Sequence, residues 1–186
     1  PILWNDPLSE NLLLHADNPL MDQFVEVHPE LISSSVSAPP PTFMSIPAIG
    51  VESMVGSLQI LDIGNSQAYA TPDNLIGHIP ETANPGEFGA AWFFGHLESP
   101  TRGEGSVFRD LPKIPALIRK GIPVYVTVQN GTSTYLYQLT SSSVVHQDDL
   151  AIFEIDAPSI VLVTCVPKFS YDYRLIITGS LIGIKD

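Results

Sequence analysis

Residues 160–181 constrain the fold of this chain more than any other stretch, because they contain two strongly apolar, β-branched runs. Val, Ile, Leu and Thr dominate Ile160–Thr164 and Tyr173–Leu181, which predicts two β-strands joined by a short irregular link. The first strand ends on Cys165, the only cysteine, and the second opens with Arg174. If the strands are neighbours, a guanidinium lies beside a thiol, where it favours the thiolate and can stabilise an oxyanion.

A second apolar run, Ala91–Phe94, leads through Gly95 to His96. A lone cysteine is more often a small buried apolar residue than a nucleophile. Two buried strands that each end on a reactive side chain are what a cysteine–histidine site requires, because strand ends present polar tips to a cleft. The histidine therefore makes Cys165 a candidate nucleophile.

Short strands with turn residues between them recur over the rest of the chain. Asn130-Gly131, between two alternating runs, is the strongest hairpin signal. Asp110–Lys120 is predicted to be a short helix that Gly121 ends. There is no βαβ alternation, so we expect an all-β fold, a closed barrel of about eight strands with short helices. The candidate strands are Thr42–Ile46, Gly56–Ile60, Gln67–Ala70, Ala90–Phe94, Pro123–Gln129, Ser133–Ser143, Ile160–Thr164 and Tyr173–Ile184.

The composition changes near residue 41, which predicts an N-terminal helical extension over 1–41 and a barrel domain over 42–186. Asn18-Pro19 is a typical helix start, and apolar residues spaced along one face predict a helix that ends before Pro29. Ser9–Ala16 is compatible with an earlier helical turn. Ser33–Pro41 is rich in serine and proline, which is typical of an extended, mobile linker.

Charge and cysteine content exclude several classes of protein. The chain has 8 basic and 20 acidic residues, a net charge of −12, which argues against nucleic acid or an anionic membrane surface as the principal partner. One cysteine excludes an internal disulfide. No apolar run reaches the roughly 18 residues of a membrane-spanning helix.

The motifs around Cys165, Arg174 and His96 resemble those of the sortases, the cysteine transpeptidases of bacterial surfaces. The family's Thr-Leu-x-Thr-Cys strand end is matched by Val161–Cys165, with Val161 in place of the first threonine. Arg174 follows, and Gly95-His96 lies upstream, as in the family. The Cys-x-Pro-Lys-Phe-Ser segment is most similar to the class E group. The resemblance covers about Thr42 to Ile184.

The resemblance implies a role for each candidate residue. Cys165 would attack the carbonyl of a threonine–glycine bond in an LPxTG-like sorting motif and form a thioester. His96 would give a proton to the departing amine and take one from the incoming amine. Arg174 would hydrogen-bond the substrate backbone or the oxyanion, and Thr164 would line the peptide groove. Neither a cofactor nor a metal is expected.

The resemblance also implies partners and a location. We expect a monomer at the extracytoplasmic face of the cell membrane, with an anchor preceding the residues shown. Its substrates would be sorting-signal peptides of surface proteins and an amine from a peptidoglycan precursor or a pilin lysine. Three alternatives stay open: an idle barrel that only binds peptides or proteins, a cysteine hydrolase, and a pilus-polymerising sortase whose N-terminal extension is a lid. The lid motif, Asp-Pro-aromatic, is incomplete at Asp6-Pro7-Leu8.

The remaining polar motifs favour structural interpretations. We expect His78 to be a buried structural histidine and His146 to be solvated in a polar loop. Ile79–Ala83 resembles a sorting signal but lacks the apolar anchor and basic tail that would follow one. No cluster has zinc spacing. Loop carboxylates that would have to converge for a calcium site are Glu98, Glu104, Asp148, Asp149, Glu154 and Asp156.

Overall fold

The computed structural model describes residues 19–29, 32, 34, 37–63, 66–98, 103 and 105–186, with the backbone alone for 59–63 and 66–70. Strands dominate these residues, as predicted. The strands are β1 (Val25–Glu26), β2 (Phe43–Ile46), β3 (Val51–Ser57), β4 (Gln59–Ile63), β5 (Ser66–Ala70), β6 (Ile76–His78), β7 (Ala90–Phe94), β8 (Val124–Asn130), β9 (Ser133–His146), β10 (Ser159–Val166) and β11 (Tyr173–Lys185). The helical segments are η1 (Met21–Gln23), η3 (Pro47–Ile49), η4 (Leu111–Lys113), α2 (Ile114–Arg119) and η5 (Gln147–Asp149).

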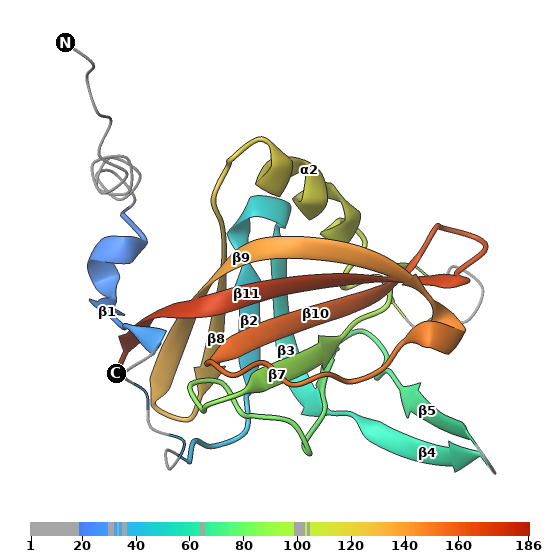
Figure 1. The fold of residues 1–186 in the computed structure, drawn as a ribbon, viewed down its shortest axis with the longest axis horizontal. Helices are drawn as coiled ribbons and strands as arrows, with labels where there is room; N and C mark the ends of the chain where they lie inside the picture. Colours follow the sequence, from blue (N-terminus) through green and yellow to red (C-terminus); the bar gives the residue numbers. More distant parts are fainter. Residues whose placement is uncertain are drawn as a thin grey trace.

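Within the described residues, eight strands close into a barrel in the order β11-β10-β7-β6-β3-β2-β8-β9, and β9 pairs again with β11 (Figure 1). The sheet is mixed, because β10 runs parallel to β7 and β3 runs parallel to β6, while the other neighbours are antiparallel. The predicted closed β-barrel is therefore confirmed. A two-stranded β4–β5 hairpin projects from it (Figure 1).

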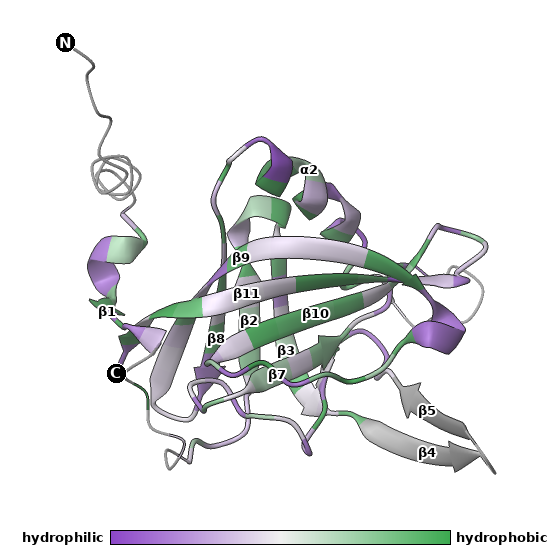
Figure 2. Ribbon diagram, in the orientation of Figure 1, coloured by the Kyte–Doolittle hydropathy of each residue, from purple (hydrophilic) through white to green (hydrophobic). Residues whose placement is uncertain are grey.

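The central strands β7 and β10 are buried on both faces, which explains their nearly continuous apolar sequences. Alternate residues such as Phe93 and Leu162 fill the barrel interior. The residues between them, including Trp92 and Val163, form a second cluster on the outside, beneath the segment that contains Leu150. Figure 2 shows this hydrophobic character along β10, in contrast to the paler middle of β9. A strand that is fixed on both faces holds its end rigidly.

Local sequence patterns predicted a hairpin turn and a helical segment at the correct positions. The Asn130-Gly131 signal forms the β8–β9 hairpin, and the predicted 110–120 helix is divided into η4 and α2, ending before Gly121 at a φ of 71°. The weak strand predicted at Gly56–Ile60 is wrong in its bounds, because it straddles the end of β3 and the start of β4. The three-residue strand β6 was not predicted.

The helix predicted to begin at Asn18-Pro19 is wrong. Only the 3₁₀ turn η1 forms, and the chain then extends into β1, whose Val25 pairs with Ile184 of β11. Pairing with the exposed end of a long strand satisfies backbone groups that a short, marginal helix would leave at its ends. The predicted turn at Ser9–Ala16 lies outside the described residues.

The end of the predicted serine-proline linker is packed on the barrel. Ala38 is buried, its N–H donates to Glu87 Oε1 at 2.8 Å, and its carbonyl accepts from Asn84 at 3.0 Å. These residues therefore lie against the loop between β6 and β7 instead of extending into solvent. In the part of the chain that the structure describes, no helix has the length and apolar character needed to cross a bilayer.

Candidate active site

The parallel pairing of β7 and β10 brings two candidate residues to the same end of the barrel. Phe94 is opposite Val163 in the register, and the Gly95 N–H donates to the Val163 carbonyl at 3.2 Å. One position further along, the Thr164 hydroxyl donates to the Gly95 carbonyl at 2.8 Å. Because both strands point the same way, His96 and Cys165 follow these paired residues at one rim.

Arg174 is directly opposite Cys165 in the antiparallel β10–β11 register. Side chains of directly opposed residues leave the sheet on the same face, with Cβ atoms about 5 Å apart. Cys165 and Arg174 are both half-buried, so neither is sealed in the interior. The register thus places a guanidinium and a thiol on one face at the rim.

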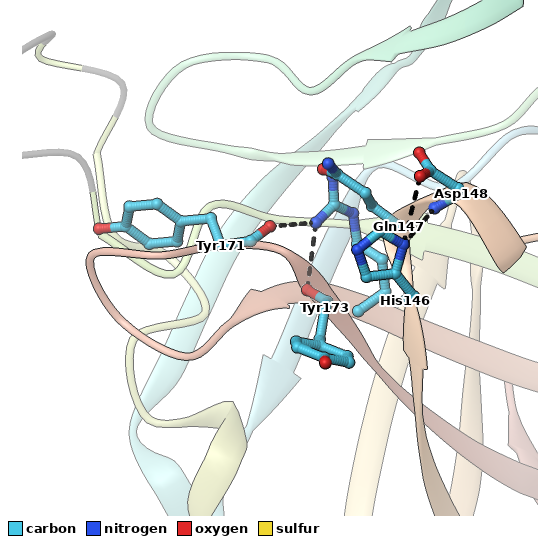
Figure 3. A network of polar contacts seen from close by, with 6 residues as sticks. His146, Gln147, Asp148, Tyr171 and Tyr173 are labelled. Carbon is cyan, nitrogen blue, oxygen red and sulfur yellow. Dashed lines mark hydrogen bonds and ion pairs between the residues drawn. The ribbon is translucent and has the colours of Figure 1, made fainter.

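The guanidinium of Arg174 donates to three acceptors, which belong to Tyr171, Tyr173 and Gln147, all labelled in Figure 3. Its Nη1 donates to the carbonyls of Tyr171 at 2.7 Å and Tyr173 at 3.1 Å, and its Nη2 donates to Gln147 Oε1 at 3.2 Å. Planar donors that engage several oxygens in a fixed geometry are a property of arginine that lysine lacks. The head group is therefore oriented by the β10–β11 loop, by the first residue of β11 and by the residue after β9.

His96 is oriented by a backbone oxygen. Its Nε2 lies 3.1 Å from the carbonyl oxygen of Thr71. A carbonyl oxygen can only accept, so Nε2 carries the proton in this contact. The ring is half-buried, and its orientation is set by the segment that follows β5.

Thr164 is 2% exposed, and its hydroxyl joins the ends of β7 and β10. The sequence indicated that it lines a peptide groove, and that role stays a prediction. The structure shows a different contact: the Thr164 hydroxyl hydrogen-bonds Gly95, the residue that precedes His96.

A cavity of about 370 Å³ lies between the loop that follows His96 and the loop that follows Cys165. Its walls are mostly apolar, and among the described lining residues one carboxylate, that of Glu98, lies near the cations Arg109 and Lys168. Glu98 pairs with Arg109 at 3.1 Å and with Lys168. The hydrogen bond from Lys168 is the main reason why the pKa of Glu98 is lowered. The lining residues are Leu97, Glu98, Arg109, Pro112, Val166, Pro167 and Lys168.

The other histidines have different environments. His78 is 3% exposed, its Nε2 bonds the Ala83 carbonyl at 3.0 Å and burial lowers its pKa, so the structural interpretation is confirmed. His146 is not in a loop: it is the last residue of β9, half-exposed, with its ring edge-on to Tyr173 and its Nδ1 3.4 Å from Asp148. Long pairing with β11 extends β9 to this point.

Among the described residues, no three His, Cys, Asp or Glu side chains gather in a group that could hold a metal ion. Glu104, one of the loop carboxylates considered for calcium, lies outside the described residues. Glu98, another of them, is engaged with two cations instead of a carboxylate cluster.

Sequence reasoning missed the residues that orient the candidate side chains. Nothing in the sequence connects Gln147 or Thr71 with the site, because both contacts depend on how distant strands pair. Tyr171 had a weak signal, since it lies in the short link that precedes Arg174.

A closed mixed barrel that carries a cysteine and a histidine at neighbouring strand ends, with an arginine opposite the cysteine, defines a narrow class of protein. A family model described as the sortase domain matches residues 44–182. The chain belongs to the sortase family. Members of this family are cysteine transpeptidases that act at the cell surface on sorting-signal peptides of surface proteins.

Solved structures show the same fold. Sortase C1 from Streptococcus agalactiae is 24% identical with a TM-score of 0.57, and the match covers 75% of this chain and 66% of that one. Sortase A from Listeria monocytogenes is 16% identical with a TM-score of 0.59, covering 77% and 88%. Sortase E1 from Streptomyces coelicolor, solved with a tripeptide in its active site, is 20% identical with a TM-score of 0.56, covering 81% and 93%.

The similar structures include sortases of types A, C, D and E, so they support the family and select no single class. No curated protein matches the chain.

Proposed function

We propose that this protein is a sortase transpeptidase that cleaves an LPxTG-like motif through a Cys165 thioester and joins the acyl group to an amine, anchoring surface proteins to the cell wall. The observation that carries the proposal is the placement of three side chains at one rim. Cys165 is opposite Arg174 in the β10–β11 register, and β10 ends beside β7, which leads to His96.

The first half-reaction forms the thioester. Cys165 starts as a thiolate and His96 as an imidazolium. Sγ attacks the carbonyl carbon of the scissile bond, and the carbonyl electrons move to oxygen, where the Arg174 guanidinium donates hydrogen bonds. The C–N bond then breaks, and the departing nitrogen takes a proton from His96.

The second half-reaction reverses these roles. The acceptor amine attacks the thioester carbonyl and gives a proton to His96, the C–S bond breaks, and Cys165 leaves as a thiolate. The contact between Nε2 of His96 and the Thr71 carbonyl fixes the orientation of the ring for both proton transfers. The enzyme ends in its starting protonation state.

Transfer to an amine requires that water reach the thioester slowly. The cavity between the two loops supports this, because its walls are mostly apolar and it adjoins the residues that follow both His96 and Cys165. We propose that the acceptor amine enters through this cavity.

We propose that residues 42–186 form the catalytic barrel and 1–41 an extension, which agrees with a family match over 44–182. Within the described part of the extension, β1 pairs with Gly183 and Ile184, nine and ten positions along β11 from Arg174. At about 3.3 Å per residue this is roughly 30 Å along the strand from Arg174. We propose a stalk instead of a lid, because the lid motif is incomplete at Asp6-Pro7-Leu8. With it we propose general anchoring by a monomer at the extracytoplasmic face instead of pilus polymerisation.

Quenched peptides with Leu-Pro-x-Thr-Gly and Leu-Ala-x-Thr-Gly sequences, incubated with and without triglycine, test the proposal. We expect a ligated product that depends on the amine and a thioester adduct on Cys165 by mass spectrometry. Cleavage that ignores the amine identifies a hydrolase. The absence of any adduct identifies a peptide-binding barrel without catalysis.

A further inference from the structure

We propose that Tyr171 is a positioning residue that couples Arg174 to the loop following His96, an inference that rests on the proposed transpeptidation. The Tyr171 hydroxyl donates to the backbone carbonyl of Glu98 at 2.8 Å. Its own carbonyl accepts from Arg174 Nη1 at 2.7 Å. One residue therefore links the segment two positions beyond His96 to the guanidinium opposite Cys165.

The backbone at Tyr171 makes this double contact possible. Its φ of 60° lies in the left-handed region, which residues other than glycine rarely adopt. Such conformations persist where the surroundings determine them, and they concentrate at functional sites. Figure 3 shows the consequence: the phenol ring and the carbonyl of Tyr171 point in opposite directions, so that they reach different partners.

Two further contacts fix the loop around Tyr171. Its N–H donates to the carbonyl of Pro167 at 2.9 Å, which closes a tight turn directly after the cysteine. Lys168, in the same turn, pairs with the carboxylate of Glu98. Ion pairs at a solvated rim contribute little on their own, so the half-buried phenol is the stronger link between the loops.

The chemistry needs this link because the arginine must meet charge that develops on the carbonyl oxygen while His96 delivers a proton to the nitrogen of the same bond. A small misplacement of either group slows the reaction even where the peptide still binds. Tyr171 does not contact the reacting atoms in this scheme. It acts through Arg174 and through the His96 loop.

Tyr171→Phe removes only the hydroxyl, and Tyr125→Phe on β8, outside the site, is the matched control. We expect kcat for peptide cleavage to fall roughly 10- to 100-fold in Tyr171→Phe while KM for the peptide stays unchanged. We also expect iodoacetamide to alkylate Cys165 about threefold more slowly at pH 7, because a loosened guanidinium favours the thiolate less. Tyr125→Phe should match the wild type in all three quantities.

A double-mutant cycle with Arg174→Ala identifies the route of the effect. If Tyr171 acts in part through Arg174, Tyr171→Phe slows alkylation more in the wild-type background than in the Arg174→Ala background, where only the contact with the loop following His96 remains. The proposal is overturned if Tyr171→Phe slows alkylation equally in both backgrounds, or if it leaves kcat unchanged. It is also overturned if the decrease in kcat is accounted for by a lower Tm. Alkylation needs no substrate, so the coupling is tested even if the wild type transfers no peptide and the proposed function fails.

Discussion

Thr164 and Gly95 are joined by a hydrogen bond of 2.8 Å, and each immediately precedes one of the two proposed reactive residues, Cys165 and His96. Both are buried, so water does not compete for this bond. It continues the parallel pairing of β7 and β10 one step beyond the last paired strand positions, Phe94 and Val163. This hydrogen bond therefore holds the ends of β7 and β10 together at the rim of the barrel.

Thr164→Val should lower the free energy of unfolding by about 1–3 kcal/mol, because a buried hydroxyl–carbonyl hydrogen bond is lost without compensation from solvent. Denaturant unfolding measures the change. Thr140→Val is the control: Thr140 is exposed on β9, with a marginal contact of 3.5 Å to Thr178, and we expect a change within about 0.5 kcal/mol. Equal losses in the two variants would remove the structural role assigned to Thr164.

Cys165→Ala should abolish both cleavage and transfer, because no thioester can form. Arg174→Lys should lower kcat by roughly 10²–10³, the usual effect of losing an oxyanion donor, since lysine does not reproduce the forked contacts to Tyr171, Tyr173 and Gln147. Arg119→Lys, at the end of α2, is the control. Peptide turnover is the measurement, and normal turnover by Arg174→Lys would show that the assigned role is wrong.

Gly95→Ala should destabilise the barrel and reduce activity together. A Cβ at this position would lie 2.5 Å from Cδ2 of Phe108, a fully buried ring that has no room to withdraw. Overpacking of this kind costs about 1–3 kcal/mol, and relief of the clash would displace the neighbouring His96. Gly56→Ala is the comparison, because its Cβ meets only the flexible end of Leu75 at 2.9 Å. We expect a lower Tm and slower peptide turnover for Gly95→Ala than for Gly56→Ala. Similar Tm values for the two variants would refute the expectation.

Burial of His78 makes stability depend on pH. Desolvation lowers its pKa below the ordinary value of 6.5, so the unfolded chain binds the proton more readily than the native protein between the two values. Unfolding free energy therefore rises with pH through this window, and acidification from about pH 6.5 destabilises the fold. His78→Gln removes the titrating group, so its unfolding free energy should vary less between about pH 5 and 6.5. A variant as acid-sensitive as the wild type there would contradict this.

Local sequence patterns predicted the parts of the fold that local forces decide. The aromatic-rich run at Ala90–Phe94 and the β-branched run at Ile160–Thr164 are both apolar on both faces, so only a buried strand suits them. Asn130-Gly131 specifies its hairpin through backbone conformation alone. In contrast, the apolar spacing at 20–27 is compatible with a helix, and pairing with β11 overrides that weak preference.

The sequence by itself determined which chemical groups are available: one thiol, a histidine and an arginine at strand ends, in a chain whose motifs resemble those of the sortases. Only the tertiary structure decided how these groups are held. The Thr71 carbonyl at His96, Gln147 at Arg174 and the contacts of Tyr171 all depend on the register between strands that are distant in the chain. A register is a property of paired strands, because each hydrogen-bond ladder is set by both partners, and a single segment therefore does not encode it.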